Sequence, residues 1–417
     1  MRTFVDNENR FIEMFDPKTG FYQRSSILDK DGIETDKDPF MRCFPALIDI
    51  GIMEQCICAD RCNVDCYQRA CDRTGPNMNL KKYESIMKQC LGKVFQVALG
   101  GAGDPDTHEN FEEILKMTRD YSIIPNYTTS GIALTKEKAE ISKKYCGAVA
   151  VSEHFADYTE RALDLLINSG VKTNIHFVVS SKTIDIAIDY LKNNKFHKGI
   201  NAVVFLLYKP IGLGQQKYVL KPNDLRLKEF FNLIDSKKFD FKIGFDSCFS
   251  SGIVNNSNNI NLQSIDYCEA ARFSMYIDSN LNAMPCSFGN QSSNWKVSLL
   301  NHTIQEAWDS KEFNLFRNQL KNFCPNCDRR ASCSGGCPIC REVTLCNSMS
   351  TTREAKALGI SCERFLNTSL RPLVHLRDTF IVGKCLLNLP IKVYLGLTGD
   401  FQRHSDDKVE SKLRGEL

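Results

Sequence analysis

Six short apolar runs alternate with amphipathic helical patterns between residues 46 and 240 of this 417-residue chain. The runs are ALIDIGIM, VFQVALGG, IIPNYTT, GAVAVSE, VKTNIHFVVS and INAVVFLLY. The segments between them, such as ENFEEILKMTRDY and TERALDLLINSG, carry apolar residues at spacings of three and four. Strands that are joined by helices run parallel with right-handed crossovers, so the pattern predicts a parallel sheet with covered faces. Such a sheet is an open doubly wound one or a full or partial barrel, and ligands collect at the carboxyl ends of its strands in either form.

The rest of the chain divides around this pattern. Residues 1–45 form an N-terminal extension in which FIEMFDPKTGFYQRSSI predicts a hairpin that turns through Asp16, Pro17 and Gly20. Past about residue 215 the alternation degrades and cysteines return, so we expect a loop-rich second domain, residues 241–366, that metal stabilises. Residues 367–417 end in the charged DDKVESKLRGEL and are predicted to be a solvated tail.

Composition excludes several classes of function. A formal charge of +3 without a basic stripe gives no support for nucleic acid as a partner. The first residues carry acids and no apolar signal core, which predicts a cytoplasmic protein. The apolar stretch FIVGKCLLNLPIKVYLGL is interrupted by Lys384, Pro390 and Lys392, so it is expected to be buried or interfacial structure and not a membrane span.

Nineteen cysteines in a cytoplasmic chain should be reduced, which favours metal or iron–sulfur ligation. The stretch CICADRCNVDCYQRAC, residues 56–71, places five thiols directly after the first apolar run. The stretch CPNCDRRASCSGGC places four more at metal-ligand spacing, where a structural zinc site is the alternative interpretation. Four isolated cysteines are assigned no function: Cys43, Cys90, Cys146 and Cys385.

Three features favour iron and sulfur over zinc. The first cysteine stretch lies at the ligand-binding end of a strand, where a structural zinc site would be out of place. The thiols left after the isolated ones are set aside suffice for about three cubane clusters, at up to four thiolates each. The turn VALGGAGDPD follows the second strand, where Gly100, Gly101 and Gly103 allow close approach of a ligand and Asp104 is able to accept hydrogen bonds from an amine.

Together these motifs resemble the radical S-adenosylmethionine enzymes, and more closely the subgroup with a C-terminal SPASM domain that carries auxiliary clusters. The resemblance spans roughly residues 46–365. It implies an α/β fold with a partial (β/α)6 TIM-like barrel over residues 46–240, followed by a SPASM domain over residues 241–366. In this family a cysteine loop after the first strand holds a four-iron cluster through three thiolates, and the fourth iron is open to S-adenosylmethionine.

The resemblance implies a ligand set for that first cluster. Cys66 is implied as the third ligand because Tyr67 follows it, and Cys62 as the second. The first ligand is Cys58 or Cys56. Cys58 has the family's three-residue gap to Cys62, whereas Cys56 lies at the family's distance from the strand residue Asp49. Cys71 is an alternative third ligand.

Further family landmarks imply contacts with S-adenosylmethionine. GGAGDP takes the place of the turn that receives the methionine amino group, YTTSG matches the third-strand turn, and AVSEH holds the fourth-strand position that contacts ribose or carboxylate. The implied cofactor-binding residues are Tyr67, Gly100, Gly101, Asp104, Thr129, Ser130, Ser152 and Glu153.

Two auxiliary four-iron clusters are implied in the second domain. The first would be held by Cys268, Cys286 and Cys337, with Cys248 as the fourth ligand. The second would be held by Cys324, Cys327, Cys333 and Cys362, with Cys340 or Cys346 as alternatives to Cys362.

The implied function is a peptide maturase. Reductive cleavage of S-adenosylmethionine would give a 5′-deoxyadenosyl radical that abstracts hydrogen from a small ribosomal precursor peptide and forms a thioether or carbon–carbon crosslink. An electron donor such as flavodoxin or ferredoxin is the second expected partner. The alternatives are a formylglycine-forming sulfatase maturase and, from another class, a non-catalytic zinc or iron–sulfur binding module.

Overall fold

The computed structural model describes residues 1–19, 21–27, 41–57, 64–259, 265, 267–291, 293–322, 327, 333 and 335–346. The predicted ligands Cys58, Cys62, Cys324 and Cys362 and the predicted C-terminal tail lie outside the described residues. Within the described part of the chain, no helix is long and apolar enough to cross a membrane.

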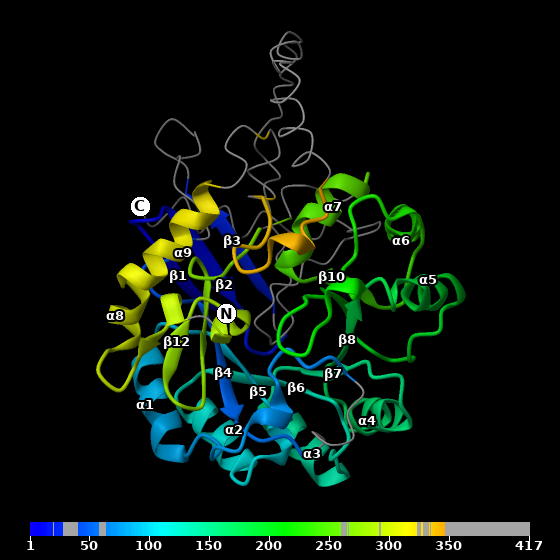
Figure 1. Ribbon diagram of the computed structural model, residues 1–417. Coiled ribbons are helices and arrows are strands. Elements are labelled where there is room, and N and C mark those ends of the chain that lie inside the picture. The colour runs from blue at the N-terminus through cyan, green and yellow to red at the C-terminus, as the bar shows by residue number, and fades with distance from the viewer. Residues whose placement is uncertain are drawn as a thin grey trace, which may run out of the picture.

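A parallel sheet forms the centre of the protein (Figure 1). Its strands are β4 (Leu47–Met53), β5 (Gln96–Gly101), β6 (Ile124–Thr129), β7 (Val149–Ser152), β8 (Thr173–Val179), β9 (Ala202–Leu207) and β10 (Lys242–Phe245). They lie side by side in sequence order, and each pairs in parallel with its neighbours. The six predicted runs correspond to β4 to β9, so the predicted parallel architecture is confirmed.

The crossover helices lie along the outer side of this sheet (Figure 1). They are α1 (Leu80–Cys90), α2 (Phe111–Asp120), α3 (Lys136–Tyr145), α4 (Asp157–Asn168), α5 (Ile184–Asn193) and α6 (Leu225–Ser236). Polar side chains fix several starts, because Asn79 and Thr135 accept hydrogen bonds from backbone N–H groups in the first turns of α1 and α3. The helices bury their apolar stripes against outward side chains such as Ile50 and Phe177.

The inner face of the sheet is lined by small and polar residues. Ile48, Ile50 and Ile52 of β4 pack in the core beneath the helices, so Asp49 and Gly51 point to the opposite face. The register of the parallel strands shows which residues of β5 to β8 lie on the same inner face as Asp49 and Gly51. They are Ala98, Gly100, Asn126, Thr128, Ala150, Ser152, Asn174 and His176. A Cβ added at Gly51 would lie 2.3 Å from the Tyr276 hydroxyl, so the glycine admits that ring to the inner face.

A second group of strands continues the same sheet beyond β4. Strand β11 (Ser274–Ile277) pairs in parallel with β4, and Tyr276 lies opposite Asp49. β12 (Asn282–Met284) and β13 (Val297–Ser298) follow in antiparallel order. Three helices accompany this part of the chain: α7 (Ser250–Asn256), α8 (Ile304–Trp308) and α9 (Lys311–Asn322).

The N-terminal residues form a three-stranded antiparallel sheet of β1 (Arg2–Asp6), β2 (Phe11–Phe15) and β3 (Tyr22–Ser26). Phe15 pairs with Tyr22, so the predicted hairpin is confirmed. The Glu13 carboxylate is fully buried in this sheet, 2.6 Å from the Arg24 guanidinium and 3.4 Å from that of Arg42.

Candidate functional site

The glycine-rich turn after β5 lies directly against the start of the cysteine loop after β4. Gly101 has a φ of 127°, and a Cβ added there would lie 2.3 Å from the Met53 carbonyl oxygen. A Cβ at Gly103 would lie 2.1 Å from the Gln55 oxygen and 3.1 Å from the Cα of Cys56. Only glycine permits this approach, so the turn and the cysteine loop form one packed unit at the carboxyl end of the strands.

The far end of the cysteine loop is held by the segment that follows β9. The Leu213 N–H donates to the Cys66 carbonyl at 3.0 Å. Cys66 is half-buried, whereas Cys71 is exposed in the short 3-10 helix Ala70–Asp72. The structure therefore brings Cys56, Cys66 and Cys71 to the same end of the barrel. The choice of cluster ligands stays a prediction because Cys58 and Cys62 lie outside the described residues.

Asp104 and Ser130, two predicted cofactor-binding residues, contact each other. The Ser130 N–H donates to Asp104 Oδ1 at 2.8 Å, and the Ser130 hydroxyl donates to Oδ2. Burial raises the pKa of Asp104, although these hydrogen bonds oppose the rise. Burial and the neighbouring Asp104 carboxylate raise the pKa of Asp106 to about 6. The turns after β5 and β6 are thereby joined by the Asp104–Ser130 contact at the mouth of the barrel.

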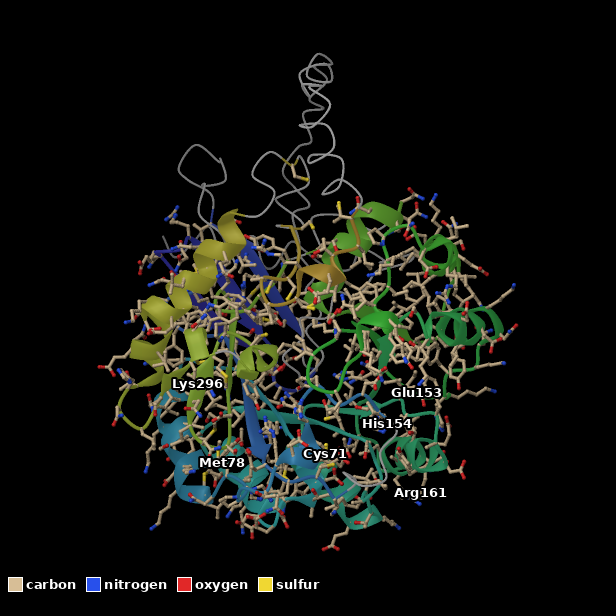
Figure 2. The ribbon with its side chains drawn as sticks, viewed as in Figure 1. Cys71, Met78, Glu153, His154, Arg161 and Lys296 are labelled. Carbon is tan, nitrogen blue, oxygen red and sulfur yellow. The ribbon has the colours of Figure 1, made fainter. Side chains whose placement is uncertain are left out.

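The other predicted cofactor-binding residues end β6 and β7. The Thr129 hydroxyl accepts a hydrogen bond from Gly131 N–H at 2.9 Å, which fixes the third-strand turn. Ser152 lies opposite His176 on the inner face. Glu153, in the connection between β7 and α4 (Figure 2), accepts from Phe155 N–H at 2.7 Å. Burial raises the pKa of Glu153.

His176 and Asp49 are buried inside the barrel and were not among the predicted site residues. Burial lowers the pKa of His176 to about 3, so its imidazole is neutral. Burial, and then the Glu269 carboxylate, raise the pKa of Asp49 well above its usual range. The signal in the sequence is a polar residue between apolar neighbours in each strand, as in NIHFV.

Four predicted ligands of the first auxiliary cluster line a single cavity. They are Cys248 after β10, Cys268 before β11, Cys286 after β12, and Cys337. Burial raises the pKa of all four thiols, that of Cys286 to about 12. Across the described residues, no three side chains of His, Cys, Asp or Glu converge closely enough to hold a single metal ion. The four thiols thus surround a space and do not meet at a point.

Lys209 is a buried cation in the wall of this cavity that the sequence analysis missed. Its ammonium lies 3.1 Å from the Leu207 carbonyl oxygen, 3.3 Å from Asp246 Oδ2 and 4.2 Å from the centre of the Phe288 ring. Burial on its own would lower the pKa of Lys209, but Cys248 and Asp246 raise it above its usual value. The amine therefore stays charged beside the four thiols.

The predicted second auxiliary cluster is only partly described. Cys333 and Cys340 are buried, and Cys327 and Cys346 are half-buried. Since Cys324 and Cys362 lie outside the described residues, this ligand set stays a prediction.

A parallel half-barrel of this topology, with cysteines on the loop after its first strand, defines the class of fold found in radical S-adenosylmethionine enzymes. SuiB from Streptococcus suis bound to S-adenosylmethionine superposes with a TM-score of 0.57 at 20% identity, over 71% of this chain and 74% of SuiB. SuiB bound to the precursor peptide SuiA gives a TM-score of 0.55 at 18% identity, over 76% of this chain and 80% of SuiB. The protein anSMEcpe with bound AdoMet gives a TM-score of 0.53 at 19% identity, over 72% of this chain and 87% of anSMEcpe.

These likenesses show that the chain has this fold, and they confirm the predicted partial barrel. No model of a protein family matches the sequence. No curated protein matches it either.

Proposed function

We propose that the protein is a radical S-adenosylmethionine enzyme that modifies a ribosomally made peptide. The observation that carries this proposal is the convergence of Cys248, Cys268, Cys286 and Cys337, from four separate segments, on one cavity beside the half-barrel. The fold is shared with SuiB, which has been solved with S-adenosylmethionine and with its precursor peptide SuiA. It is also shared with anSMEcpe, which has been solved with AdoMet and a peptide.

The donor set suits iron–sulfur clusters. Thiolates are the ligands that such clusters require, and the Lys209 ammonium lowers the electrostatic cost of gathering four of them in a buried space. The SAM-binding cluster would be held by Cys66 with Cys62 and either Cys58 or Cys56. When bound, it supplies the electron that cleaves S-adenosylmethionine to methionine and a 5′-deoxyadenosyl radical.

The chain's own residues would bind and orient the cofactor and the peptide. The Asp104–Ser130 pair presents a carboxylate at the mouth of the barrel, suited to an amine. Ser152 and Glu153 offer polar groups one strand further on. The neutral His176 at the inner face adds no competing charge there. Buried walls on the helix side exclude water from the reaction.

The product is proposed to be a thioether or carbon–carbon crosslink, with formylglycine formation as the second candidate, as the resemblance of the sequence implies. We also propose a cytoplasmic location and a flavodoxin or ferredoxin as electron donor, as expected from the sequence.

The test is anaerobic reconstitution followed by reduction in the presence of S-adenosylmethionine. The protein should hold about twelve irons, from three four-iron clusters, and should release 5′-deoxyadenosine. Cys66→Ser should abolish this release, because the open cluster is lost. Cys286→Ser should retain it and fail only in peptide modification. A fully loaded protein that releases no 5′-deoxyadenosine would favour the non-catalytic binding module.

A further inference from the structure

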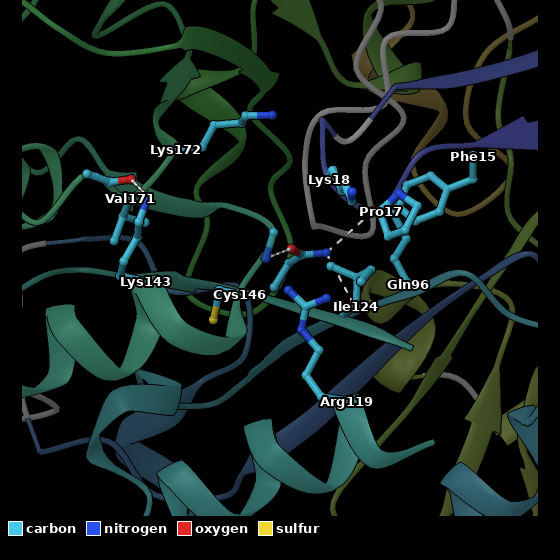
Figure 3. A pocket seen from close by; sticks show the side chains of 13 residues that line it. Phe15, Pro17, Lys18, Gln96, Arg119, Ile124, Lys143, Cys146, Val171 and Lys172 are labelled. Carbon is cyan, nitrogen blue, oxygen red and sulfur yellow. Dashed lines mark hydrogen bonds between the residues drawn. The ribbon is translucent and has the colours of Figure 1, made fainter. Parts of the chain in front are cut away.

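Figure 3 shows a cavity of about 300 Å³. Its lining includes residues at or just before the starts of β5 to β8, so it lies at the end of the barrel opposite the candidate active site. Its walls include Ile124 at the start of β6, Gly147 just before β7 and Lys172 just before β8. Pro17 and Lys18, in the β2–β3 turn, close one side. Strand β8 spans seven residues, so roughly 20 Å, at about 3.3 Å per residue, separates this cavity from the carboxyl ends of the strands.

The charges around the cavity are all of one sign. Lys18, Arg119, Lys143 and Lys172 line it, and none of its described lining residues is Asp or Glu. Cys146 also lines it, but burial raises the pKa of that thiol to about 12, so the thiol is neutral. Outside the lining, the Asp16 carboxylate attracts the Lys172 ammonium, and it already accepts hydrogen bonds from Lys18 N–H at 3.0 Å and the Thr19 hydroxyl at 2.7 Å.

Three of the four cations are held in place by neutral carbonyl oxygens. Arg119 Nε donates to the Tyr145 carbonyl, Lys143 Nζ to that of Gly170 at 2.6 Å, and Lys172 Nζ to that of Thr19. A guanidinium has five N–H donors and an ammonium three, so each retains donors for a further acceptor. These contacts fix the positions of the charges without neutralising them.

Lys18 and Lys143 are exposed, whereas Arg119 and Lys172 are partly buried, and burial of these two charges costs free energy that an anion would recover. Burial lowers the pKa of Arg119 and of Lys172 below their ordinary values. The floor of the cavity is rigid, because Asn126 Oδ1 accepts from the N–H groups of Gly147 and Ala148 at 3.0 Å each. The cavity is thus preformed, and its unmatched charge is positive.

We propose that this cavity binds a small polyanion that carries two or more phosphate or carboxylate groups. Arginine and lysine donors converging from four segments match the oxygens of such groups with charge-assisted hydrogen bonds. The volume is at the lower end of the range for small-molecule pockets, which suits a compact molecule and not a folded partner. The proposal is independent of the radical chemistry at the other end of the barrel.

Calorimetric titration of the full chain with pyrophosphate and with citrate tests the proposal, at low salt and against sodium chloride of matched ionic strength. Saturable binding of either anion, with a rise in Tm that the chloride control lacks, is the expected result. The two anions distinguish a phosphate ligand from a carboxylate one.

Variants locate the binding. Arg119→Gln should weaken it about tenfold or more, as expected for a lost charge-assisted hydrogen bond. Lys18→Gln, on the exposed turn, should weaken it while leaving the fold intact, so the test survives if Arg119→Gln fails to fold. Lys228→Gln, which removes the same charge from the exposed side of α6, is the matched control. Absence of saturable binding, or equal weakening by Lys228→Gln, would overturn the proposal.

Discussion

The ring of Tyr67 packs against the ring of Phe288, with their centroids 4.6 Å apart. Tyr67 follows the predicted cluster ligand Cys66, and Phe288 lies two residues after Cys286. The Lys209 ammonium lies over the ring of Phe288. The cysteine loop of the barrel and the thiol-lined cavity are therefore in direct contact through one aromatic pair.

This contact predicts an energetic coupling that is measurable without any cluster. In a double-mutant cycle of Tyr67→Leu and Phe288→Leu, the double mutant should lose about 0.5–1.5 kcal/mol less than the sum of the two single losses, because each single variant already removes the contact. Urea unfolding of the metal-free chain gives the four free energies. Strictly additive losses would show that the two rings do not stabilise each other.

Two adjacent glycines should respond differently to the same substitution. A Cβ at Gly100 meets no atom within 4 Å, so Gly100→Ala should keep its Tm yet bind S-adenosylmethionine more weakly, because the methyl group enters the proposed cofactor space. Gly101→Ala should cost about 1–3 kcal/mol of stability through backbone strain and a clash with Met53. Thermal unfolding and calorimetric titration separate the two effects. If Gly100→Ala binds S-adenosylmethionine with unchanged affinity, the cofactor does not lie beside Gly100.

Lys209→Met should make the first auxiliary cluster harder to reduce. Loss of the buried ammonium leaves the thiolates and Asp246 without their cation, so the reduction potential should fall by on the order of tens of millivolts, where 59 mV is a tenfold change for one electron. A redox titration followed by electron paramagnetic resonance measures it. Lys228→Met, far from the thiols, serves as the control, and a potential unaltered by Lys209→Met would contradict the assigned role.

Glu13 predicts a pH dependence of stability. Burial favours the neutral form, but the Arg24 and Arg42 guanidiniums hold the pKa of Glu13 below its ordinary value of 4.5. The ion pairs therefore stabilise the fold above that value, and this contribution is lost as pH falls through the folded-state pKa.

Glu13→Gln should accordingly lower the free energy of unfolding by about 3–5 kcal/mol at pH 7, since it leaves two buried guanidiniums without their negative partner. The difference from wild type should shrink in acid, below about pH 4.5. Urea unfolding from pH 7 down to pH 3.5 checks this. A difference that stays constant over that range would mean that Glu13 is not ionised in the folded protein.

The sequence predicted the strands whose apolar runs alternate with helical patterns, including the four-residue β7, and missed β10 and β11, which lie beyond that alternation. β4 to β9 correspond to those runs, whereas KIGF of β10 and SMYI of β11 are four residues each and carry no periodicity that separates a strand from a turn. Their assignment depends on pairing with β9 and β4, which are remote in sequence. Tertiary pairing, not local pattern, makes them strands.

The same limit applies to the site. Cys248, Cys268, Cys286 and Cys337 were predicted because the resemblance to the SPASM subgroup implies them as ligands of one cluster. Lys209 was missed because YKPIG contains nothing unusual, and its burial arises only when the end of β9 meets the segment after β10.

The position of β10 and β11 has a consequence for how the chain must be made. β10 covers the outer edge of β9, and β11 covers that of β4. A fragment limited to residues 46–240 would keep the six predicted strands but present two bare rows of N–H and C=O groups, one on each side. Such rows pair readily with other chains. An incompletely synthesised or proteolysed barrel should therefore self-associate more readily than a chain that extends past β11, in which the long edges of β9 and β4 are paired.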